Sequence, residues 1–73
     1  MTNEKREEVM NKFQDCEESF EDESKDREFI DDNCIHIVRD NIRFCIFINF
    51  GSDEKQERQM RVFTKKVDKI LNN

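Results

Sequence analysis

Carboxylates are the side chains whose density in this chain could support chemistry, because they bind cations and basic surfaces. Six of the nine residues from 15 to 23 are acidic. Through residue 33 the chain has 13 acidic and 5 basic residues, a net charge of −8, whereas the remainder has 5 acidic and 8 basic residues, a net charge of +3. Blocks of like charge repel one another and often act as interaction surfaces.

Acidic side chains at helical spacing can imitate a nucleic acid. Carboxylates three or four residues apart on a helix lie about 5 to 6 Å apart, which is of the same order as the spacing of neighbouring phosphates along a DNA strand. A helix and loop of this kind would fit the DNA-binding groove of a basic protein. The alternative is a solvated face that only keeps the protein in solution. The predicted partner-binding residues are Asp15, Glu17, Glu18, Glu21, Asp22, Glu23, Asp26, Glu28, Asp31 and Asp32.

The cysteines and the one histidine are the candidates for nucleophilic or metal chemistry. The hairpin register predicted below places Cys45 opposite His36, with Cys34 on the same face. The chain has no Cys-x-x-Cys pair, and it is too short to wall off a catalytic pocket. A calcium-loop pattern in the acidic segment fails, because Arg27 replaces its glycine and Asn33 its bidentate glutamate. We therefore expect no catalytic residue, no metal, no cofactor and no enzyme activity, with a zinc-stabilised module as a weaker alternative.

The elements that position these residues begin with an amphipathic helix. Val9, Phe13, Cys16 and Phe20 follow one another at helical spacing, which predicts a helix over residues 3–20. Carboxylates near its C-terminal end oppose the helix dipole, so either the helix continues into the acidic segment or the carboxylates serve a use. Residues 21–33 have no clean period and are predicted to form an acidic loop.

A β-hairpin is predicted over residues 34–50, where β-branched and aromatic residues flank Asp40-Asn41. That dipeptide suits a two-residue turn. The resulting register puts one apolar set on the core face: Ile35, Ile37, Ile42, Phe44, Ile46, Ile48 and Phe50. A mixed set faces the other way: Cys34, His36, Val38, Arg43, Cys45, Phe47 and Asn49.

A second helix is predicted over residues 53–71, with Ser52 as its N-cap. Its apolar stripe is Met60, Phe63, Val67 and Ile70, and its outer side carries Lys55, Arg58, Arg61, Lys65, Lys66 and Lys69. These cations could bind nucleic acid, but the net charge of −5 repels phosphates and no aromatic residue alternates with them. We expect no direct nucleic-acid binding.

The predicted fold is therefore α+β, with the order helix, hairpin, helix (αββα) in one domain over residues 1–73. An isolated hairpin is marginal, and the longer second strand would present an unpaired edge. Pairing between two copies would make a four-stranded sheet across a homodimer. This reading supports an alternative function, a small homodimeric module that binds a partner through its strand face or strand edge.

No run of residues in the chain is long and apolar enough to cross a membrane, and no apolar signal segment follows the first residues. The three cysteines suit reduced thiols better than a disulfide framework. We expect a cytoplasmic protein without a membrane partner, in the host cytoplasm if its source is viral.

The acidic half, residues 4–32, resembles the small acidic early proteins that bacteriophages use against their hosts, several of which mimic DNA. The resemblance rests on Glu17, Glu18, Glu21, Asp22, Glu23, Asp26, Glu28, Asp31 and Asp32, with the size and element order of the chain. It includes similarity to the phage inhibitor of the bacterial nucleoid protein HU, which implies competition with DNA for a basic host protein. A phage anti-CRISPR or other host-takeover protein fits the same features, and the cationic last helix means that any mimicry would be local.

Overall fold

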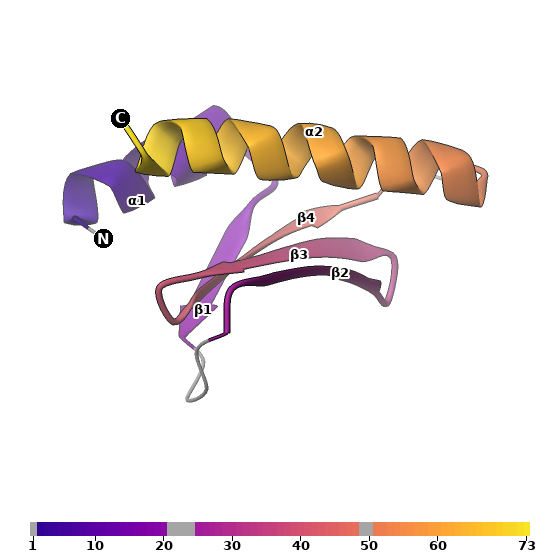
Figure 1. Cartoon of the computed structure of the whole chain (residues 1–73), viewed down its shortest axis with the longest axis horizontal. Coiled ribbons are helices and arrows are strands. Elements are labelled where there is room, and N and C mark those ends of the chain that lie inside the picture. The colour runs from indigo at the N-terminus through magenta and orange to yellow at the C-terminus, as the bar shows by residue number, and fades with distance from the viewer. Residues whose placement is uncertain (1, 21–24, 49–50) are drawn as a thin grey trace.

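Six elements form the fold, which a computed structural model describes for residues 2–20, 25–48 and 51–73. In chain order they are α1 (Asn3–Lys12), β1 (Glu17–Phe20), β2 (Arg27–Asp31), β3 (Cys34–Arg39), β4 (Ile42–Phe47) and α2 (Asp53–Leu71). The strands form one antiparallel sheet in the order β1-β4-β3-β2. Both helices lie on the same side of this sheet, and α1 lies beside the end of α2, where Lys5 Nζ donates to the Leu71 carbonyl at 2.7 Å (Figure 1).

The predicted hairpin between β3 and β4 is confirmed, register included. Ile37 pairs with Phe44, as a two-residue turn requires. Asp40 and Asn41 in that turn have φ values of 52° and 68°. Asp and Asn tolerate this left-handed region, and two such residues in succession give the hairpin turn whose twist matches that of the strands. The hairpin was predicted to reach residue 50, whereas β4 ends at Phe47, and residues 49–50 lie outside the described part of the chain.

The prediction of one helix over residues 3–20 is wrong, because α1 ends at Lys12 and β1 follows it. Thr2 caps the helix as expected, its hydroxyl accepting a hydrogen bond from the Lys5 amide at 3.3 Å. Stopping at Lys12 puts a cation at the negative end of the helix dipole and keeps the following carboxylates away from it. It also leaves Glu17–Phe20 available to pair with Ile42–Cys45. In the hairpin alone, this side of β4 would be an unpaired strand edge.

The prediction of an acidic loop over residues 21–33 is also wrong over its second part, because β2 occupies Arg27–Asp31. Asp32 and Asn33 form a second turn with φ values of 50° and 61°. This turn uses the same Asp-Asn dipeptide as the turn at 40–41. The four-stranded sheet therefore comes from one chain, and a second copy is not needed to build it.

The core lies between the helices and one face of the sheet. Its buried residues are Val9, Cys16, Ile35, Ile37, Ile42, Phe44, Ile48, Phe63, Val67 and Ile70. The α2 stripe is as predicted, with Ser52 accepting a hydrogen bond from the Lys55 amide as N-cap. Neither helix in the described ranges has the length and apolarity that crossing a bilayer would demand.

Candidate protein-binding site

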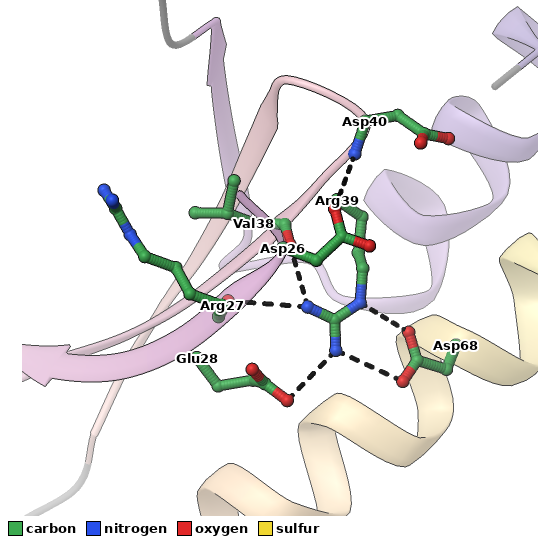
Figure 2. A network of polar contacts seen from close by, with 7 residues as sticks. All are labelled: Asp26, Arg27, Glu28, Val38, Arg39, Asp40 and Asp68. Carbon is green, nitrogen blue, oxygen red and sulfur yellow. Dashed lines mark hydrogen bonds and ion pairs between the residues drawn. The ribbon is translucent and has the colours of Figure 1, made fainter. Parts of the chain in front are cut away.

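Two of the predicted partner-binding carboxylates that the structure describes, Glu28 and Glu18, form ion pairs within the fold. Glu28 pairs with Arg39, which lies at the end of β3. Arg39 donates to both oxygens of Asp68 on α2, at 2.8 and 3.3 Å, and to Glu28 on β2 at 3.1 Å (Figure 2). The same guanidinium donates to the Val38 carbonyl at 2.8 Å. The hydrogen bond with Asp68, followed by that with Glu28, raises the pKa of Arg39 above its already high usual value. Arg39 therefore links α2 to β2 as a permanent cation.

The second internal ion pair joins α1 to β1. Arg6 donates through Nη2 to Glu18 at 2.8 Å and through Nε to the other carboxylate oxygen at 3.3 Å. The Arg6 guanidinium also lies over the ring of Phe20, 5.0 Å from its centroid. Glu18 therefore faces the helix side of the sheet and is engaged there.

The other predicted acidic residues that the structure describes do not gather on one face. Glu17 pairs across strands with Cys45, so its side chain is on the sheet face opposite to that of Glu18. Asp26 accepts a hydrogen bond from the Asp40 amide at 3.3 Å. Asp15, Asp31 and Asp32 are exposed, the last two at the β2–β3 end of the sheet; Glu21, Asp22 and Glu23 lie outside the described residues.

The predicted cysteine and histidine arrangement is confirmed on the sheet face away from the helices. His36 Nδ1 lies 3.0 Å from Cys45 Sγ, and the His36 ring stacks on Phe29 at 4.6 Å between centroids. His36 Nε2 lies 3.3 Å from the Asp31 carbonyl oxygen. Because a carbonyl oxygen only accepts, Nε2 carries the proton in the neutral ring, and Nδ1 accepts from the Cys45 thiol.

The pair of His36 and Cys45 is poorly suited to nucleophilic catalysis or metal binding. Burial, the largest effect, raises the pKa of Cys45, which keeps it a neutral thiol, whereas a nucleophile or a metal ligand needs the thiolate. Within residues 2–20, 25–48 and 51–73, no group of three or more His, Cys, Asp or Glu side chains is placed to hold a metal ion. The side chains of Phe29 and Cys45 both contact the His36 ring, so the three side chains are engaged with one another.

A groove that the sequence did not predict lies between β4 and one flank of α2. It has a volume of about 350 Å³, and its apolar lining consists of Phe13, Ile46, Phe47, Val62 and Phe63. The rings of Phe13 and Phe63 meet edge to face at 4.8 Å, which fixes the inner wall. Phe47 is 70% exposed and Val62 46%, so apolar surface here is open to water.

The backbone beside this groove has unpaired polar groups in the part of the chain that the structure describes. Ile48 N–H donates to the Asn33 carbonyl at 2.8 Å, so the polar backbone groups of Ile48 face β3. Successive residues of an antiparallel strand direct these groups to opposite sides, and those of Phe47 therefore point away from β3. On that side β1 pairs with β4 only as far as Cys45, and no backbone partner of Phe47 occurs among the described residues.

Cations on α2 border the groove. Arg58 and Lys66 line it, and both are exposed. Neither belongs to an ion pair of the described residues, unlike Arg6 and Arg39. A larger hollow of about 480 Å³ shares Lys66, but charged side chains such as Glu8, Lys12 and Lys69 dominate its wall. Among the hollows that the described residues form, the groove combines an apolar lining, an unpaired strand backbone and unpaired cations.

Phe47 was predicted to lie on the mixed sheet face, and its exposure agrees with that position. The remaining groove residues were missed. Val62 was the available signal, because it is apolar yet lies off the predicted α2 stripe. No family of proteins, no curated protein and no solved structure matches this chain.

Proposed function

We propose that this protein acts by binding another protein, and that the groove between β4 and α2 is the binding site. The observation that carries the proposal is the open edge at Phe47 next to an apolar groove with unpaired cations. Exposed aromatic residues in such hollows are the usual energetic centres of protein interfaces. An open strand edge is a further site at which another chain can attach.

The acidic DNA-mimic hypothesis needs carboxylates that face one way and are free to meet a basic partner such as HU. Glu18 and Glu28 are engaged in ion pairs, and Glu17 faces away from Glu18. The exposed residues Asp31 and Asp32 keep this hypothesis as the second candidate. It makes a different prediction about which charges matter, so one set of variants separates the two.

The test compares capture of proteins from a bacterial lysate by the full chain and by matched variants. Phe47→Ser removes the exposed aromatic residue of the groove, and Phe20→Ser is its control, because Phe20 is 73% exposed at another site. Arg58→Glu with Lys66→Glu reverses the groove charge. Arg61→Glu with Lys65→Glu makes the same change on the opposite flank of α2.

The proposal expects a captured protein, identified by mass spectrometry and then purified, to lose about 30-fold or more in affinity with Phe47→Ser and about tenfold with the Arg58 and Lys66 double variant. The two controls should change affinity less than about threefold. Loss of binding only when Asp31 and Asp32 are changed to Lys would support the mimic and overturn the groove.

A further inference from the structure

We infer that the groove binds an extended, acidic segment of its partner, which adds to the sheet as a strand beside Phe47. This inference rests on the proposed function and names the chemistry of the partner. Strand addition supplies backbone hydrogen bonds, while pockets for alternate side chains supply selectivity. The site offers both features.

The backbone contribution comes from one residue. Phe47 presents an N–H and a C=O toward the open side of β4, whereas the neighbouring Ile48 uses its N–H for Asn33. A segment lying along β4 would accept from the first group and donate to the second. These two hydrogen bonds would extend, along the same side of β4, the pairing that β1 forms with Ile42–Cys45.

Side-chain selectivity comes from the two faces of the sheet. Ile46 lies on the helix side with Phe63 and Val62, while Phe47 lies on the other face. Alternate side chains of an added strand would therefore point into the groove or lie beside the Phe47 ring. The groove accepts an apolar side chain, because three aromatic rings and two aliphatic side chains line it.

The charge of the partner follows from the cations above this groove. Arg58 and Lys66 project from α2 on the flank that lines it, and they have no carboxylate partner in the described ranges. Acidic residues next to the apolar anchor would pair with them. The net charge of −5 opposes the binding of a long polyanion such as a nucleic acid. A second copy of this chain is an outcome that the test distinguishes.

The test uses the full chain and a capped hexapeptide of sequence Glu-Asp-Phe-Glu-Leu-Asp. Binding is measured by calorimetry, and amide exchange is followed by NMR. In the free protein we expect the Phe47 amide to exchange fast and the Ile48 amide slowly, because only Ile48 has its hydrogen bond. Adding the peptide should slow the Phe47 amide by about tenfold or more and leave that of Ile48 unchanged.

Two N-methylated peptides separate strand addition from simple filling of the groove. One is methylated at the odd amides and the other at the even amides, so their side chains are identical. An added strand uses one edge only, so one peptide should lose about tenfold in affinity and the other should bind as before. A peptide with lysine in place of every acidic residue should lose at least as much.

Equal affinities for the two methylated peptides overturn strand addition, and tighter binding of the lysine peptide overturns the acidic partner. If the Phe47 amide is protected in the free protein in a concentration-dependent way, the occupant is a second copy and the inference falls. If the peptide fails to bind while the captured partner depends on Phe47, strand addition fails and the proposed function stands.

Discussion

The acidic half of the chain and helix α2 carry opposite charges and use them differently. In the acidic half, Glu18 and Glu28 are paired with Arg6 and Arg39, and Asp26 holds a backbone amide. On α2 one carboxylate, Asp68, is paired, while the exposed cations Lys55, Arg58, Arg61, Lys65, Lys66 and Lys69 are in no ion pair of the described residues.

This difference means that formal charge is a poor guide to the charge available for binding. Carboxylates satisfied by internal cations contribute to holding the sheet and the helices together. The cations of α2 face solvent, and two of them border an apolar groove. In the region with a net charge of −8, Glu18, Asp26 and Glu28 are engaged within the fold, whereas the binding surface that we propose lies mainly in the region of opposite sign.

The largest effect that we expect from breaking this scaffold is at Arg39. Changing Arg39→Met keeps a long, unbranched side chain and removes the hydrogen bonds to Asp68 and Glu28. The free energy of unfolding should fall by about 2 kcal/mol, because charged hydrogen bonds of an arginine side chain that is only 13% exposed are lost. Urea denaturation followed by circular dichroism measures the loss.

The matched variant Arg6→Met tests the other ion pair. The Arg6 side chain is more exposed than that of Arg39, 22% against 13%, and it pairs with one carboxylate where Arg39 pairs with two, so the loss should stay below about 1 kcal/mol. Equal losses in the two variants would show that burial does not distinguish these pairs.

Cys16 anchors the acidic half in the core, and its titration gives a smaller effect of known sign. Burial raises the pKa of Cys16 from 9.0 to about 12. The unfolded chain ionises first, so the stability that the buried thiol contributes is intact below pH 9 and is lost as the pH rises from about 9 to about 12. The slope should reach about 1.4 kcal/mol per pH unit at most.

Urea denaturation at pH 8, 9 and 10 in the presence of a reductant checks this slope, with Cys16→Ala as the comparison. The variant should lose stability less steeply over that range, since Cys34 and Cys45 remain in both proteins. Parallel slopes would assign the alkaline loss to other groups.

Local signals in the sequence predicted two parts of the fold. The N-cap at Ser52 and the apolar stripe that follows it both indicate helix α2. The turn dipeptide Asp40-Asn41 and the alternation of apolar and polar residues on both sides of it both indicate the β3–β4 hairpin. Strand β1 was missed because Val9, Phe13, Cys16 and Phe20 fit a helix, while its strand pairing depends on β4, over 20 residues away. Strand β2 was missed because Asp32-Asn33 was not read as the same turn as the one at 40–41.

The site was harder to predict than the fold because it depends on contacts between distant elements. The exposed position of Phe47 follows from strand alternation. The groove forms only where Phe13, after α1 ends, meets Phe63 and the flank of α2. The ion pairs that engage Glu18 and Glu28 likewise join residues 12 and 11 apart in different elements, at spacings that no local pattern reveals.

The smallest expected effect comes from the acidic residues that remain exposed. Changing Asp15, Asp31 and Asp32 to Lys alters the charge by six units without breaking an ion pair of the described residues. Affinity for a partner bound in the groove should change less than about threefold at 150 mM salt, because none of the three residues lines the groove and salt screens exposed charges. Binding to the purified captured protein, measured at 50 and 500 mM salt, checks this. A loss above tenfold that disappears at high salt would instead show that the carboxylates form the partner's docking surface, and the contrast between the two regions would be reversed.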